Sequence, residues 1–170
     1  MTTKGLSYSA ISISLIFIFF LLFRGATNII NSFVIPIILY QYYKKFTFKE
    51  YLVLVLAVFI FSFLFFFQQI FFVIFYAIMA LLLDYLFKNK KSLFYRLIAT
   101  TIVFLILFVL TITLTDFILG TALRKVLFSV VGGNKIALIF LYLGTSIIVA
   151  IALNVIASEV NKRLNKKNMI

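Results

Sequence analysis

Asp116 is the residue in this sequence best placed to bind a ligand within an apolar region. It lies about one helical turn before the end of the apolar run 97–119 and follows three threonines in the preceding five positions. Ionisable residues inside such runs more often line an interior or a binding site than face the surroundings. Arg124 follows two turns later, so the carboxylate can contact a ligand directly, pair with Arg124, or reach water.

A second polar group follows the first apolar run. Arg24, Asn28 and Asn31 are followed directly by Ser32, and together they offer one cation and several hydrogen-bonding groups in a short stretch. Two interpretations stay open. The group can line the mouth of a helical bundle, or it can be the start of a helix that is hydrogen-bonded to water.

The other polar residues have structural explanations. Asp84 precedes Lys88 by four residues, which favours an ion pair within one helix. Asn154, Gln68 and Gln69 are typical of hydrogen bonds between helices.

Several kinds of chemistry are excluded by composition. The chain has no histidine and no cysteine, which removes the usual metal ligands, thiolate nucleophiles and near-neutral proton carriers. It also lacks the glycine-rich loop with lysine that cradles nucleotide phosphates. We therefore expect a protein that is not an enzyme, with no catalytic residue, metal or cofactor.

The elements that hold these residues are apolar helices. The sequence is 65% hydrophobic and only 12% charged, far from the composition of soluble proteins. Because about 20 apolar residues cross a bilayer, we predict one all-α transmembrane domain over residues 1–170. Its six predicted spans are 6–23, 26–43, 51–67, 70–87, 97–119 and 136–158. Only Gln68 and Gln69 separate the third span from the fourth, and one helix over both would be much longer than a bilayer core is thick, which predicts a tight hairpin there.

The basic residues predict the orientation of the bundle. Most of the 16 Lys and Arg residues lie in the two tails, in the second loop and in the fourth loop, and most tyrosines lie at the same boundaries. Cytoplasmic loops are rich in Lys and Arg, so both termini are predicted to be cytoplasmic. The net charge of +12 is thus a topology signal and does not indicate nucleic-acid binding.

Residues 121–131 form the longest connection and are predicted to be a short interfacial helix. Apolar residues recur there at helical spacing, opposite Arg124 and Lys125. This helix either anchors the chain at the membrane surface or caps an outward-facing pocket. In the second case Arg24, Arg124, Lys125 and Lys135 would attract an anionic solute.

A small six-span chain with both ends inside resembles the substrate-binding S component of energy-coupling factor (ECF) transporters. The segments VIPIILYQYYKKFTFKEYLVLVLAVFIFSF and FYAIMALLLDYLFKNKKSLFYRLI, within residues 29–98, also resemble YybS-like membrane proteins. The resemblance implies a multi-pass protein of the bacterial plasma membrane. It also implies a coupling transmembrane subunit and ATPase subunits as partners, besides membrane lipids.

The resemblance further implies which residues bind. In S components an Ala-xxx-Ala motif on the first helix contacts the coupling subunit, and here Ala10 and Ser14 stand at the equivalent spacing. Substrate is bound near the outer ends of the helices, which implicates Arg24, Asn28 and Asn31. Asp116 and Arg124 would lie opposite them.

The last span is similar to a family of another class, the rod-shape protein MreD. The segment IALNVIASEV contains an asparagine like that of the last MreD helix, and Asp84 in LLLDYLF is a weaker similarity. This resemblance implies a membrane scaffold in cell-wall synthesis, and it is the alternative to solute binding.

Overall fold

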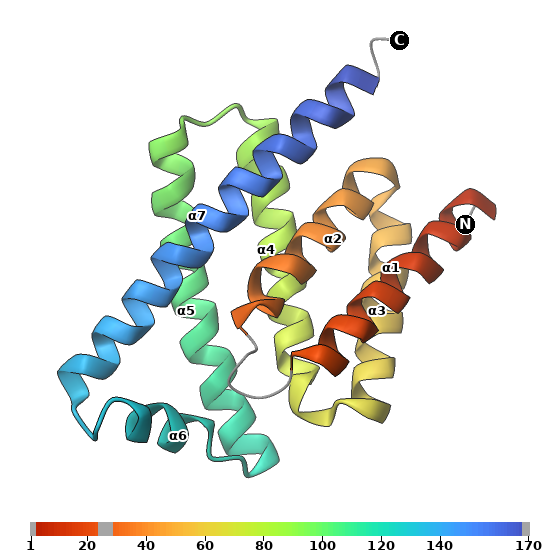
Figure 1. The fold of residues 1–170 in the computed structure, drawn as a ribbon. Helices are drawn as coiled ribbons and strands as arrows, with labels where there is room; N and C mark the ends of the chain where they lie inside the picture. Colours follow the sequence, from red (N-terminus) through yellow and green to blue (C-terminus); the bar gives the residue numbers. More distant parts are fainter. Residues whose placement is uncertain (1–2, 24–28, 168–170) are drawn as a thin grey trace.

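Residues 3–23 and 29–167 are described by the computed structural model, and within these ranges the chain is helical with no strand. Figure 1 shows the arrangement of the helices. They are α1 (Thr3–Leu22), α2 (Asn31–Lys45), α3 (Phe48–Phe65), the 3-10 helix η2 (Phe67–Gln69), α4 (Ile70–Lys88), α5 (Leu93–Leu119), α6 (Leu123–Val130) and α7 (Lys135–Lys167).

Five of these helices are long and apolar enough to cross a membrane: α1, α3, α4, α5 and α7. Their outward faces are apolar as well, since Ile102, Ile106 and Leu110 of α5 are each at least half exposed. A soluble protein does not expose so much contiguous apolar surface. The chain is therefore built as an all-helical, multi-pass membrane protein.

The second predicted span, 26–43, differs from the rest. It corresponds to α2, which has 15 residues and includes Pro36, and its length of about 22 Å is less than the roughly 30 Å of a bilayer core. More than half of α2 is buried, including Leu39 and Tyr40. Neighbouring helices, rather than lipid, thus surround α2, and the prediction of six full-length spans is not confirmed.

The turns between the other helices follow local signals. The predicted hairpin at Gln68 and Gln69 is confirmed, because α3 ends at Phe65 and η2 leads directly into α4. At the start of α3, Thr47 and Glu50 form a capping box in which each side chain accepts from the other residue's backbone N–H. The capping box therefore sets the turn between α2 and α3, and η2 sets the turn between α3 and α4.

The core lies between α2 and α4. In α4, 56% of the span is buried, against 22% to 28% in the other four spanning helices. Tyr40, Tyr51 and Tyr76 are among the largest fully buried side chains, and the Tyr51 hydroxyl donates to the Ala77 carbonyl oxygen at 2.8 Å. Aromatic packing therefore joins α2, α3 and α4, although the buried Tyr40 hydroxyl has no hydrogen-bond partner among the described residues.

The bundle has two unlike ends. The basic end is formed by the ends of α2 and α4 and the starts of α3 and α5, and α1 begins and α7 ends on the same side (Figure 1). Its described basic residues include Lys44, Lys45, Lys49, Lys88, Lys90, Lys91, Arg96, Lys162 and Arg163. The α6 end is formed by the end of α5, by α6 and by the start of α7.

Candidate ligand-binding cavity

A cavity of about 660 Å³ lies at the α6 end, between α5, α6 and α7. Its volume is within the range of about 300 to 1,000 Å³ that is typical of small-ligand sites. Figure 1 shows α5 and α7 separating toward this end, with α6 bridging them. The polar and basic residues that line it are Thr113, Asp116, Thr121, Arg124, Lys125 and Lys135.

Backbone turns of unusual geometry place the three helices around this cavity. Gly120 ends α5 in the left-handed conformation, at φ +63°, and Gly132 and Gly133 also have positive φ between α6 and α7. Glycine adopts this conformation without the steric cost of a Cβ. Asn134 then caps α7, since its Oδ1 accepts the Ile136 backbone N–H at 2.9 Å.

Asp116 attaches α6 to the end of α5. Its Oδ1 accepts the Leu123 backbone N–H and its Oδ2 accepts the Arg124 backbone N–H, both at 2.8 Å. The Thr121 hydroxyl donates to Oδ1 as well. These N–H groups belong to the first turn of α6, where a helix lacks internal acceptors and favours negative charge. Asp116 thus caps α6 from a different helix.

The predicted pairing of Asp116 with the Arg124 side chain is not formed, because the carboxylate contacts the backbone N–H of Arg124 instead. The side chains of Arg124, Lys125 and Lys135 are exposed, and among the described residues none of the three forms an ion pair. Because the Asp116 carboxylate already accepts three donors, these cations carry positive charge that no carboxylate contact neutralises.

The remaining wall of the cavity is mostly apolar. Its side chains are Val109, Ile112, Ala122, Phe128, Leu138, Ile139 and Tyr142, of which only Tyr142 carries a polar group. The Tyr142 ring packs edge-on against Phe108, with ring centroids 5.9 Å apart. The cavity thus joins a basic rim to an apolar interior, which is the combination that an amphipathic or anionic ligand requires.

The structure does not bring all the predicted site residues together. Asn31 is fully buried at the start of α2, where its Nδ2 donates to the Phe23 carbonyl oxygen at 3.0 Å, and it does not line the cavity. Arg24 and Asn28 lie outside the described residues. Of the predicted residues that the structure describes, Asp116 and Arg124 line the cavity and Asn31 does not.

The predicted partner-contact residues lie on the outer face of α1. Ala10 and Ser14 are exposed, whereas Ser9, Ile16 and Phe20 of the same helix are buried. The buried Ser9 hydroxyl is 2.7 Å from the Tyr42 hydroxyl, which joins α1 to α2. Ala10 and Ser14 therefore face away from the bundle, beside larger exposed residues such as Ile11 and Ile18.

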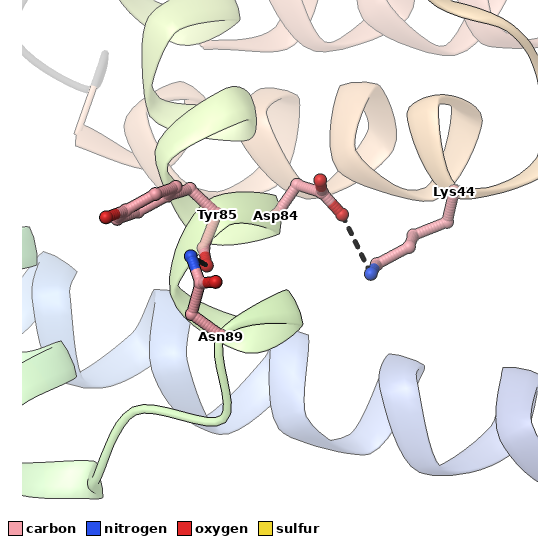
Figure 2. A network of polar contacts seen from close by, with 4 residues as sticks. All are labelled: Lys44, Asp84, Tyr85 and Asn89. Carbon is pink, nitrogen blue, oxygen red and sulfur yellow. Dashed lines mark hydrogen bonds and ion pairs between the residues drawn. The ribbon is translucent and has the colours of Figure 1, made fainter.

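Asp84 has a different partner from the predicted one. Its Oδ1 is 2.7 Å from the Nζ atom of Lys44 in α2, rather than paired with Lys88 on its own helix. Figure 2 shows Lys44 reaching across to α4, while Asn89 donates from Nδ2 to the Tyr85 carbonyl oxygen at 2.9 Å and caps the helix end. The ion pair joins two helices at the basic end, and the local interpretation of Asp84 was wrong.

The interhelical role predicted for Asn154 is confirmed. This buried side chain donates from Nδ2 to the Thr100 Oγ1 at 3.1 Å and to the Ala150 carbonyl oxygen at 2.9 Å. It therefore holds α7 against α5 at the end where these two helices lie close together.

The apolar lining of the cavity was missed by sequence reasoning. Val109, Ile112 and Ile139 sit in long apolar runs, and no local pattern separates a cavity wall from a lipid-facing surface. The basic lining could be found, because Arg124, Lys125 and Lys135 interrupt otherwise apolar sequence.

No protein-family model matches the chain, and no curated protein or solved structure shows significant similarity to it.

Proposed function

We propose that this chain is a membrane-embedded binding subunit that captures a small anionic solute from the outer face and depends on partner subunits for energy. The observation that carries the proposal is the cavity at the α6 end. It combines a ligand-sized volume of about 660 Å³ with Arg124, Lys125 and Lys135 in its lining.

Electrostatics supports anion capture at this site. Among the described residues, Asp116 supplies the one carboxylate of the lining, and its oxygens already accept the first N–H groups of α6. The charge that a ligand meets is therefore positive. Because these cations are exposed, their attraction for an anion should weaken as the salt concentration rises.

The proposed orientation uses the distribution of charge between the two ends. The ends of α2 and α4 and the starts of α3 and α5 hold a dense group of lysines, which favours a cytoplasmic location. Counting the short α2 as a sixth crossing, the chain direction alternates along the path in Figure 1. Both termini are then cytoplasmic, and the α6 end faces outward.

Energy for transport would come from other proteins, because the sequence contains no nucleotide-binding loop. The exposed face of α1 offers a contact surface, since Ala10 and Ser14 allow close approach of another helix. On this proposal a coupling transmembrane subunit packs there and is joined to ATPase subunits.

Native mass spectrometry of the gently purified protein tests the capture of a solute. We expect a retained non-protein mass that is lost from the Arg124→Gln, Lys125→Gln double variant. The matched control, Lys49→Gln with Lys88→Gln, removes the same charge from exposed residues of the basic end and should keep the mass. A spectrum without any retained mass, or one that is identical in all three proteins, would contradict the proposal.

Copurification tests the partners and separates the proposal from a scaffold in cell-wall synthesis. We expect a coupling subunit with ATPase subunits to copurify, and an Ala10→Leu, Ser14→Leu variant to lose them. Recovery of cell-wall synthesis proteins with a ligand-free chain would support the scaffold instead.

A further inference from the structure

We propose that the ligand of the α5–α6–α7 cavity is an anionic membrane lipid. Its acidic headgroup lies at Arg124, Lys125 and Lys135, and an acyl chain lies between α5 and α7. This inference rests on the anion-binding role proposed for the cavity and assigns a lipid, in place of a water-soluble anion, as its ligand.

Basic and apolar groups are separated by depth in this cavity. Lys135 begins α7, and the cavity residues Ile139 and Tyr142 lie about 6 Å and 10 Å farther along the same helix. On α5, Val109 lies about 10 Å deeper than Asp116. A ligand that fills the cavity therefore meets cations at one end and hydrocarbon at the other.

The deep part of the cavity offers little to a polar solute. Ile112, Leu138 and Ile139 have no hydrogen-bonding side-chain groups, and the Thr113 hydroxyl already donates to the Val109 carbonyl oxygen of its own helix at 2.8 Å. Apart from the Tyr142 hydroxyl, none of these side chains can replace the hydrogen bonds to water that a polar molecule would lose there. An acyl chain carries no such cost.

The apolar wall also continues onto the membrane-facing surface. Val109 is 39% exposed and Ile139 58% exposed, and they adjoin Leu110 and Phe140, which are 51% and 69% exposed. A lipid can therefore enter sideways from the bilayer, with its headgroup remaining at interface level beside α6.

Charge complementarity selects an acidic lipid over a neutral one. Among the described residues the rim holds three cations and one carboxylate, and that carboxylate accepts backbone N–H groups of α6. Each Lys or Arg near an acidic headgroup contributes about 1 kcal/mol of attraction. Removing two of them should therefore weaken binding by about tenfold or more.

The test is a native mass spectrometry titration of the full chain in an uncharged detergent with three probes. These are phosphatidylglycerol, phosphatidylcholine with the same acyl chains, and glycerol phosphate as the isolated headgroup. We expect saturable binding of phosphatidylglycerol at concentrations at least tenfold below those needed for phosphatidylcholine, and no binding of glycerol phosphate in that range.

Two pairs of variants locate the lipid. Arg124→Gln with Lys125→Gln should weaken phosphatidylglycerol binding about tenfold or more, whereas Lys49→Gln with Lys88→Gln should not. Ile139→Trp fills the apolar part of the cavity and should weaken binding about tenfold. Ile148→Trp places the same ring on an exposed residue of α7 outside the cavity and should leave binding unchanged.

The outcomes separate this inference from the function on which it rests. If glycerol phosphate binds as tightly as phosphatidylglycerol and Ile139→Trp has no effect, the ligand is a water-soluble anion. The lipid proposal then fails and solute capture stands. If no probe binds while the purified chain keeps a mass that depends on Arg124 and Lys125, the lipid proposal fails and solute capture again stands. If no probe binds and the purified chain keeps no such mass, both proposals are overturned.

Discussion

Asp84 and Asp116 lie at opposite ends of the bundle and interact with different kinds of partner. Asp84 pairs with the Lys44 side chain, and the two side chains are only 15% and 22% exposed. Asp116 instead accepts the backbone N–H groups of Leu123 and Arg124. The first aspartate joins α4 to the central helix α2, and the second holds a surface helix in place.

The difference between the two ends concerns which cations remain available. At the basic end a carboxylate uses one lysine, so that charge stabilises the packing of the helices. At the α6 end the carboxylate is used by backbone amides, so that Arg124, Lys125 and Lys135 have no carboxylate partner among the described residues. The charged pair at the basic end therefore supports the packing of the helices, whereas the cations at the α6 end are available to attract a ligand.

Removing Asp84 should have the largest effect on stability. In Asp84→Leu the Lys44 ammonium loses its counter-charge in a mostly buried position, and we expect a loss of about 2 kcal/mol. For a chain of this length that corresponds to a melting temperature lower by about 4 to 8 °C, which a thermal melt in detergent measures.

The second substitution Lys44→Met provides the control for that experiment. Replacing both partners by apolar residues of similar size removes the unpaired charge, and most of the lost stability should return. The account is contradicted if the double variant is as unstable as Asp84→Leu, or if Asp84→Leu is as stable as the native chain. In either case the ion pair does not stabilise the packing of α2 against α4.

Removing Asp116 should have a smaller and more local effect. Asp116→Ala leaves the first amides of α6 without acceptors, at a cost of about 1 kcal/mol. Hydrogen exchange should become faster at Leu123 and Arg124 and stay unchanged in α4. Thr113→Ala is the control, because the Thr113 hydroxyl bonds only within α5. Equal protection of α6 in both variants would argue against the cap.

Neutralising the cations of the cavity should have the smallest effect on stability. Arg124→Gln with Lys125→Gln removes exposed side chains without ion partners, and we expect a change within about 0.5 kcal/mol. Lys44→Gln at the basic end should cost more, measured by the same thermal melts. A large destabilisation by the first pair would mean that these charges support the fold.

Much of the fold is readable from the sequence, because the signals for long helices are local. Apolar length predicted the spanning helices, and the polar pair Gln68 and Gln69 predicted the hairpin. The short helix at 121–131 followed from its apolar periodicity. In contrast, the length of α2 was overestimated, because its apolar residues face α1, α4 and α7 and local hydropathy does not distinguish protein from lipid as the surroundings.

The site was only partly readable, because its geometry depends on contacts between distant residues. Helical spacing suggested Lys88 as the partner of Asp84, whereas the actual partner, Lys44, lies 40 positions earlier and meets it through tertiary packing. The capping of α6 by Asp116 requires a glycine turn between them, at Gly120. The cavity itself exists because α5 and α7 separate where α6 bridges them, which no pattern in either helix records.

The most direct test of the account is the sidedness of the two ends in the membrane. The native chain has no cysteine, so that single cysteines can be labelled without background. Ser129→Cys in α6 and Lys88→Cys at the end of α4 replace exposed residues at opposite ends. A membrane-impermeant thiol reagent added to intact cells should label Ser129→Cys and spare Lys88→Cys. Labelling of Lys88→Cys alone would contradict an outward-facing cavity.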